Sequence, residues 1–115
     1  MPAGLTRTDL ERRLAEQGLG GRSVVVHASL RSLGPVEGGA VAVASAFTRL
    51  CGTVLMPAFC FESNAPPPRG DRPQQNGCDY AFYEGWSTPA VPFRIEAAPV
   101  DPKMGAMACA FAALP

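Results

Sequence analysis

The chain has 115 residues, 47% of them hydrophobic, and its ten Lys and Arg side chains balance ten Asp and Glu. This length allows one domain with a modest core. The absence of a basic excess argues against a nucleic-acid partner, because a protein that neutralises phosphates needs one. No apolar run approaches a membrane span, and the polar N-terminus lacks the apolar segment of a secretion signal. We therefore expect a cytoplasmic protein that binds neither nucleic acid nor membranes.

The four cysteines, Cys51, Cys60, Cys78 and Cys109, are irregularly spaced, and the chain contains one histidine. No Cys-x-x-Cys pair is present, so the sequence predicts no zinc site and no other metal. Three of the cysteines have apolar neighbours and are expected to be buried free thiols. These three are Cys51, Cys60 and Cys109.

The N-terminal segment predicts a helix over residues 9–17. Thr8 and Glu11 have the spacing of a capping box, in which each side chain accepts the other residue's backbone N–H. Leu10 and Leu14 share one face of this helix, and Gly18 is placed to end it.

A strand, a helix and a second strand follow, over residues 23–27, 40–50 and 53–56. The apolar stripe of the central helix consists of Val43, Phe47 and Leu50. This spacing predicts a βαβ unit with two parallel strands and a right-handed crossover. Two strands alone leave both sheet edges open, so we expect further strands from sequence beyond Pro115 or from another chain.

The first strand leads into a polar stretch that contains His27, Ser29, Arg31 and Ser32. Gly34-Pro35 then marks a turn, and Gly38-Gly39 precedes the central helix. Ligands bind at the carboxyl ends of strands in α/β sheets, and helix N-termini bind phosphate. The stretch matches neither a Rossmann nor a Walker A pattern. Two interpretations therefore stay open, a phosphate-binding loop and an ordinary strand-to-helix connection.

No period is visible from residue 58 to about residue 92, apart from a short helical turn expected within residues 79–86. Aromatic side chains gather in this loop, and acidic side chains lie among them. They include Phe59, Phe61, Glu62, Asp71, Asp79, Tyr80, Phe82, Tyr83, Glu84 and Trp86. One interpretation is a loop that packs its own aromatic rings. The other is a wall for a cationic, polyhydroxylated ligand. Residues 104–114 predict a third helix with core methionines.

Three segments occur in an order that is specific. The first is residues 27–34 with 36–39, the second is residues 52–59, and the third is residues 99–106. Together they resemble the aminoglycoside 3-N-acetyltransferase family. The resemblance implies an α/β fold in which the βαβ unit forms part of a mixed-sheet sandwich with flanking helices, followed by a long loop. Residues 1–115 would form a single partial domain, the N-terminal portion of the family's domain.

Members of that family transfer acetyl from acetyl-CoA to the 3-amino group of the 2-deoxystreptamine ring of aminoglycosides, which gives antibiotic resistance. The resemblance implies that acetyl-CoA is the co-substrate and that an aminoglycoside is the small-molecule partner. A homodimer is left open. The candidate residues for acetyl-CoA are His27, Ala28, Ser29, Leu30, Arg31 and Ser32. Those for the aminoglycoside are Phe59, Glu62 and Asp79.

The general base is not identified. The resemblance implies a catalytic histidine in a His-Pro motif downstream of the third segment, beyond Pro115. His27 is the single histidine present, and we interpret it as a packing or cofactor-loop residue. The chain alone is therefore expected to be inactive. A truncated, non-catalytic CoA-binding fragment and a relative that acylates another amine remain the alternatives.

Overall fold

A computed structural model describes residues 3–86, 92–96 and 99–115. The chain consists of two compact units. The first unit comprises residues 1–59 and 100–115, and the second comprises residues 60–99. Expectations that fall on residues 87–91 within the long loop lie outside the described part.

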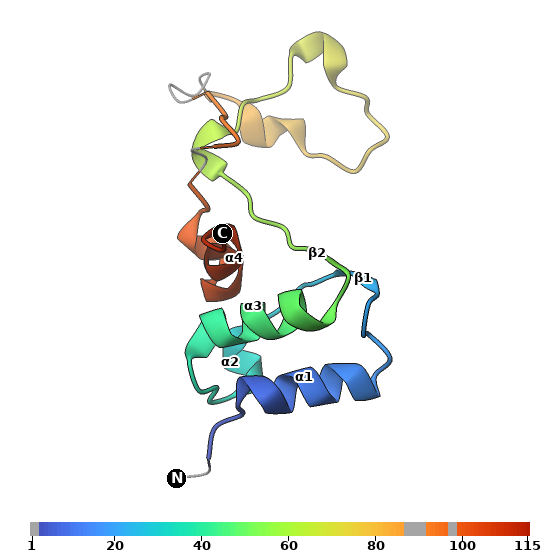
Figure 1. The fold of residues 1–115 in the computed structure, drawn as a ribbon. Helices are drawn as coiled ribbons and strands as arrows, with labels where there is room; N and C mark the ends of the chain where they lie inside the picture. Colours follow the sequence, from blue (N-terminus) through green and yellow to red (C-terminus); the bar gives the residue numbers. More distant parts are fainter. Residues whose placement is uncertain (1–2, 87–91, 97–98) are drawn as a thin grey trace. The chain divides into compact units, whose positions relative to one another are not determined.

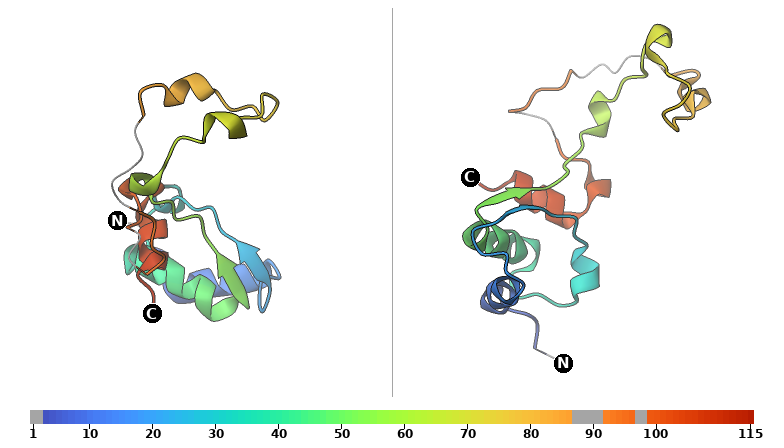
Figure 2. Two further views of the ribbon diagram at one scale, coloured as in Figure 1. Left: turned by 90° about the horizontal axis from the view of Figure 1, so that it is seen from above. Right: turned by 90° about the vertical axis from the view of Figure 1, so that its right-hand side faces the viewer.

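The first unit contains the expected βαβ arrangement. Strand β1 (Ser23–Val25) pairs in parallel with β2 (Thr53–Leu55), and the two strands lie side by side in Figure 2. Helix α3 (Gly39–Leu50) connects them. The prediction of a mixed α/β fold with parallel strands is confirmed, and the described part holds one two-stranded sheet. A sandwich stays a prediction.

Helix α3 lies between α1 (Arg7–Glu16) and α4 (Ala106–Ala112), as Figure 1 shows. The buried core of this unit comprises Leu10, Val43, Ala46 and Met107. It is made where the three helices meet because each helix has one apolar face. Phe47 and Leu14 pack against it, as the stripes in the sequence predicted.

The start of α1 differs from the expectation. Thr6, not Thr8, is the N-cap, and its partner is Asp9 rather than Glu11. The Thr6 hydroxyl lies 2.7 Å from Asp9 Oδ2, and this hydrogen bond is the main reason that the pKa of Asp9 is lowered. Leu5 forms a parallel bridge with Val36, so the extended chain ends there and the helix begins directly after it.

Glu11 does not cap α1 but connects α1 to α3 through an ion pair. Its Oε1 atom lies 3.2 Å from Arg49 Nε on α3 and 3.4 Å from Arg7 Nε. At the other end of α1, Gly18 adopts a φ of 76°. The amides of Gly18 and Leu19 bond back to Ala15 and Leu14, the pattern of a Schellman motif. The predicted glycine stop is confirmed.

Two further local expectations are corrected. The polar stretch after β1 contains a one-turn helix, α2 (Leu30–Leu33), which ends at Gly34. The predicted third helix is shorter than residues 104–114, because the 3₁₀ turn η4 (Pro102–Met104) precedes α4 and Gly105 separates them with a φ of 92°. That conformation strains any residue with a Cβ and interrupts the helix.

The face of the sheet that bears Val25 and Leu55 is open within the described chain. These two residues are register partners, and they are 63% and 62% exposed. The opposite side holds Val26, which is buried. Apolar side chains exposed in register on a two-stranded sheet leave the first unit incompletely covered.

The second unit consists of turns and extended chain in its described residues. Its 3₁₀ turns are η1 (Phe61–Ser63), η2 (Arg69–Asp71) and η3 (Tyr80–Tyr83). The short helical turn expected within residues 79–86 is thus confirmed as η3, and the Asp79 side chain caps it by accepting the Ala81 N–H.

The cysteines are free thiols. Cys51 and Cys60 are buried, as the apolar surroundings predicted. Cys109 is half-buried and Cys78 is exposed.

Candidate functional site

A groove of about 440 Å³ lies in the first unit, where the chain after β1 meets the segment that enters α4. Two short segments line it, one from each side. The lining residues are Ala28, Ser29, Leu30, Arg31, Lys103, Met104, Gly105, Ala106 and Met107. The carboxyl end of a parallel strand therefore opens onto a cavity, which is where α/β sheets bind ligands.

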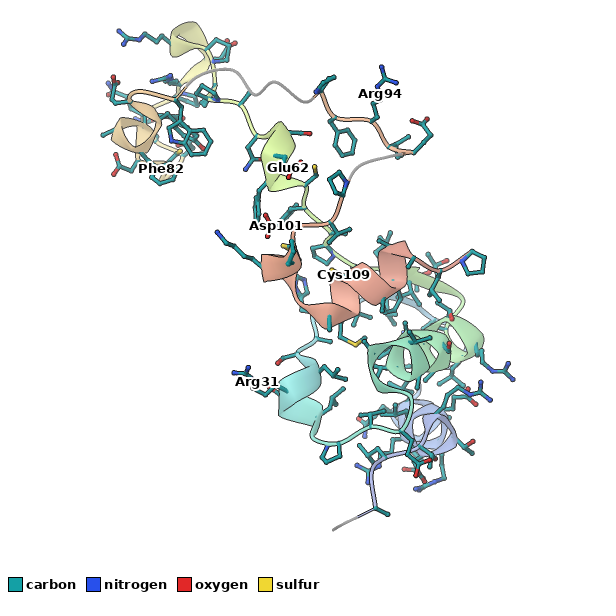
Figure 3. All side chains as sticks on the ribbon, turned by 90° about the vertical axis from the view of Figure 1, so that its left-hand side faces the viewer. Arg31, Glu62, Phe82, Arg94, Asp101 and Cys109 are labelled. Carbon is teal, nitrogen blue, oxygen red and sulfur yellow. The ribbon has the colours of Figure 1, made fainter. Side chains whose placement is uncertain are left out.

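The first wall is built by the first turn of α2 and the two residues before it. Ser29 is the N-cap of α2, yet its hydroxyl makes no capping hydrogen bond, so it is available to a ligand. Arg31 follows in the same turn and is exposed. Figure 3 shows its side chain pointing outward from α2. A short turn with a free hydroxyl and a guanidinium suits an anionic group.

The second wall is built by η4 and the first turn of α4. The Asp101 carboxylate accepts the backbone N–H of Lys103 at 2.8 Å and caps η4. Gly105 then redirects the chain into α4, and Met107 holds that helix in the core at 2% exposure. The backbone of Lys103 is thereby tied to the core of the unit.

The groove is electropositive. Arg31 and Lys103 are its charged lining residues, and none of the described residues that line it is acidic. Neither cation forms an ion pair with another described side chain. Two cations without internal partners favour an anionic ligand. No carboxylate of the described chain competes with the ligand for their charge-assisted hydrogen bonds.

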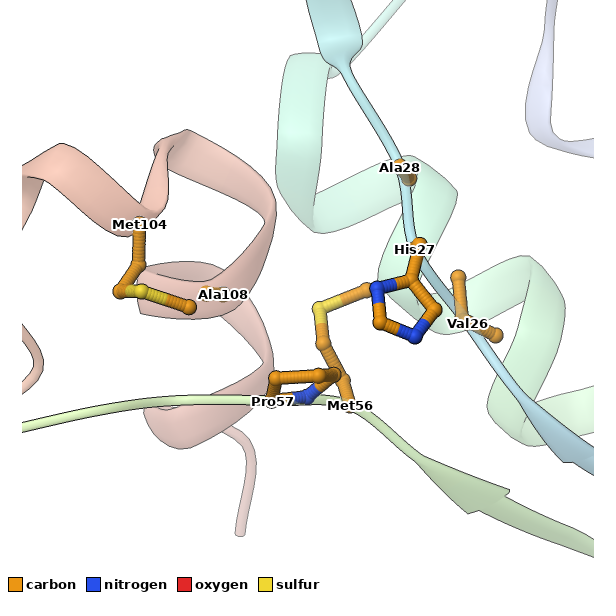
Figure 4. Close-up of a pocket in the computed structure, with 7 residues that line it drawn as sticks. All are labelled: Val26, His27, Ala28, Met56, Pro57, Met104 and Ala108. Carbon is orange, nitrogen blue, oxygen red and sulfur yellow. The ribbon is translucent and has the colours of Figure 1, made fainter. Parts of the chain in front are cut away.

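A smaller cavity of about 130 Å³ adjoins the groove and shares Ala28 and Met104 with it. His27 and Met56 line it from the chain segments that follow β1 and β2, and Ala108 lines it from α4 (Figure 4). The His27 ring is exposed and makes no hydrogen bond within the described chain. Among the described residues, no hydrogen-bond partner gives His27 a structural role.

The residues predicted to bind acetyl-CoA are divided between these cavities. Ala28, Ser29, Leu30 and Arg31 line the groove, and His27 lines the smaller cavity. Ser32 lines neither, and the N-terminus of α3 at Gly39 is also absent from both linings.

Sequence reasoning missed the second wall of the groove. The sequence predicted a third helix over residues 104–114 and gave Lys103 no role, although residues 103–106 belong to the third family segment. The signal was present in that segment: a lysine followed closely by a glycine, in a stretch specific enough to mark the family.

The candidate aminoglycoside residues are exposed. Phe59 belongs to the first unit and is 58% exposed. Glu62 and Asp79 belong to the second unit, where Glu62 lies in η1 and Asp79 caps η3.

The second unit also contains an aromatic cluster of Phe82, Tyr83 and Trp86. Their ring centroids lie 5.4–5.5 Å apart in each pairing. Phe82 is nevertheless 63% exposed and Trp86 42% exposed. The loop thus packs its own rings, as the first interpretation predicted. A wall for a cationic, polyhydroxylated ligand stays a prediction.

The described residues include no group of three His, Cys, Asp or Glu side chains placed to hold a metal ion. Within the same residues, every helix is too short or too polar to cross a bilayer.

The chain matches one known protein family. The sequence model of the family described as aminoglycoside 3-N-acetyltransferase matches residues 25–115, a span that includes both walls of the groove. The chain belongs to this family. The expectation from the three ordered segments is thus confirmed.

The fold is similar to the crystal structure of the YokD protein from Bacillus subtilis, with a TM-score of 0.71 and 27% sequence identity. The match covers 100% of this chain and 43% of the YokD chain, so the chain spans less than half the length of that structure. The comparison with curated proteins gave no match.

Proposed function

We propose that the chain acts in the acetyl-CoA-dependent N-acetylation of the 3-amino group of the 2-deoxystreptamine ring of aminoglycosides, a reaction that confers antibiotic resistance. Its part is to bind the acetyl donor in the groove between α2 and η4. The observation that carries the proposal is an electropositive groove, with a free Ser29 hydroxyl and Arg31, at the carboxyl end of β1 in a member of this family.

The residues present fit acetyl-CoA. The donor supplies an activated thioester, and its phosphates are anions that guanidinium and hydroxyl groups bind. Ser29 and Arg31 would bind this anionic part. The adjoining cavity, which Met56 and Met104 line together with His27, offers a place for an uncharged part of the same ligand.

The acceptor wall is proposed to come from the long loop. Aromatic faces stack on sugar rings, and carboxylates bind ammonium groups. Phe59, Glu62 and Asp79 are the residues proposed for this role. The exposed rings of Phe82 and Trp86 add aromatic surface to the same loop.

The proposal places the protein in the cytoplasm, with acetyl-CoA and an aminoglycoside as its small-molecule partners and without nucleic acid, membrane or metal. His27 is assigned to the cofactor loop and not to proton transfer. The reaction needs a base, because an ammonium group cannot attack a thioester until it has lost a proton.

A second candidate function follows from that need. Neither cavity is lined by an acidic residue, and His27 is the one imidazole at them. This favours, as an alternative, a CoA-binding protein without turnover, or a relative that acylates another amine. Binding of CoA without release of its thiol in the presence of aminoglycosides would select the first of these.

Replacing Arg31 with Ala tests the donor site. We expect acetyl-CoA binding to weaken by roughly 1–3 kcal/mol, the scale of a charge-assisted hydrogen bond. Isothermal titration calorimetry measures the dissociation constant, with Arg13→Ala as the control, because Arg13 is exposed on α1 and forms no ion pair with the described residues. An unchanged constant in Arg31→Ala would remove this groove from the proposal.

Replacing Glu62 and Asp79 with their amides tests the acceptor wall. Asn keeps the oxygen that accepts the Ala81 N–H, so Asp79→Asn changes charge while it preserves the cap of η3. We expect weaker binding of a 2-deoxystreptamine aminoglycoside, unchanged binding of acetyl-CoA, and an effect that fades as salt rises. Glu16→Gln on α1 is the matched control. Equal losses for both ligands would indicate a folding defect and contradict the assignment.

A further inference from the structure

Lys103 lines the groove but lies outside the proposed cofactor loop, residues 27–32. It is the one lysine among the 115 residues, since the other nine basic side chains are arginines. It lines the same groove as Arg31 but comes from the opposite wall, on η4.

The position of Lys103 is held by its neighbours. Asp101 accepts its backbone N–H at 2.8 Å, and the amides of Met104 and Gly105 close the turn at 2.9 and 3.0 Å. The turn leads directly into α4, which Met107 anchors in the core. The side chain itself is exposed. A cation on a fixed backbone binds a ligand at a smaller entropic cost than one on a mobile loop.

The charges around Lys103 leave it available. The Asp101 carboxylate bonds to the Lys103 amide and not to its ammonium group, and no described carboxylate lies within ion-pair distance of that ammonium. Arg31 is in the same situation on the other wall. Like charges that face one cavity repel each other unless an anion separates them.

We propose that Lys103 and Arg31 bind the phosphate groups of the acetyl donor from opposite walls of the groove. This inference rests on the proposed function and adds to it a second cation, Lys103, which binds the phosphates from the wall opposite Arg31. Lys103 is a binding residue here and takes no part in acyl transfer. The compact ammonium group of Lys103 suits a single contact with a phosphate oxygen. The planar guanidinium of Arg31 can donate two parallel hydrogen bonds to the same group.

The test compares two ligands in two variants of the full chain. CoA carries the phosphates, and pantetheine carries the same thiol arm without them. We expect Lys103→Met to weaken CoA binding by about 10- to 100-fold and to leave pantetheine binding unchanged. Arg13→Met, which removes an exposed cation on α1, is expected to change neither. Calorimetry gives the constants, and circular dichroism shows that each variant is folded.

The single lysine allows a second measurement on the unaltered protein. Reductive methylation modifies Lys103 and the N-terminal amine, and mass spectrometry separates the two. CoA is expected to slow the methylation of Lys103, whereas pantetheine is not. This readout does not depend on whether the variant folds.

The outcomes distinguish this inference from the proposed function. Unaltered protein that is folded and fails to bind CoA would overturn the proposed function itself. Unaltered protein that binds CoA, with Lys103→Met equally tight or Lys103 unprotected, would overturn the phosphate assignment alone. Equal weakening of CoA and pantetheine would show that Lys103 shapes the groove instead of recognising phosphate, and would also reject the inference.

Discussion

The purified 115-residue chain is expected to show no aminoglycoside acetylation above background. General base catalysis typically contributes about a hundred- to ten-thousand-fold, and among the described residues that line the two cavities none is a carboxylate and the one imidazole has no partner. His27 is the single histidine, it is exposed, and the cavity that it lines includes no described carboxylate to orient its ring. A base without an orienting partner does not hold the correct tautomer toward its substrate.

The fold points in the same direction. The sheet has two strands in the described residues, with two open edges and with Val25 and Leu55 more than 60% exposed. Sheets of this size are marginal without further cover, and open edges promote association with other chains. The acceptor wall would then lack a rigid support, and catalysis depends on precise positioning.

A thiol-release assay with acetyl-CoA and gentamicin measures the turnover. Calorimetry with CoA on the same sample shows whether the donor site is intact, so that a failure to bind is not mistaken for a failure of chemistry. Turnover well above background that disappears in His27→Gln would contradict the expectation, and it would identify His27 as the base.

Replacing Met107 with Ala is expected to lower the free energy of unfolding by about 2–5 kcal/mol. The side chain is 2% exposed and belongs to the core of Leu10, Val43 and Ala46, where α1, α3 and α4 meet. Truncation leaves a cavity that the rigid helices fill only in part. A loss of this size is a large share of the net stability of a small domain.

Met104 provides the matched control. It lies three residues earlier, carries the same side chain and is only half-buried at the two cavities. Met104→Ala should therefore cost clearly less. Urea denaturation followed by circular dichroism measures both variants, and Met107→Ala is expected either to shift the midpoint strongly or to be unfolded without urea. Equal losses for the two methionines would show that the α3–α4 contact does not carry the core.

The elements of the βαβ unit were predictable because their signals are local. Three consecutive valines, the apolar stripe on α3 and the glycine that ends α1 each act within a few residues of the chain. The family was predictable for the same reason, since its three segments are contiguous stretches of sequence. The hydroxyl of Ser29 and the guanidinium of Arg31 in the loop after β1 were likewise visible in the sequence, which left open whether the loop binds phosphate.

The start of α1 shows where local reasoning stops. Two overlapping capping patterns are present, one beginning at Thr6 and the other at Thr8, and the sequence does not rank them. The bridge between Leu5 and Val36 selects Thr6, and the ion pair with Arg49 on α3 gives Glu11 a different partner. Both contacts join segments far apart in the chain.

The sequence by itself determined the family, the parallel strand pair and one wall of the candidate site. Only the tertiary structure determined the second wall. Lys103 reaches the groove because Met107, four residues later, is buried against α3, and because the positive φ of Gly105 lets the chain turn between them. Helix packing sets that placement through the shape of the whole core, and no pattern within residues 103–107 encodes which loop will lie opposite.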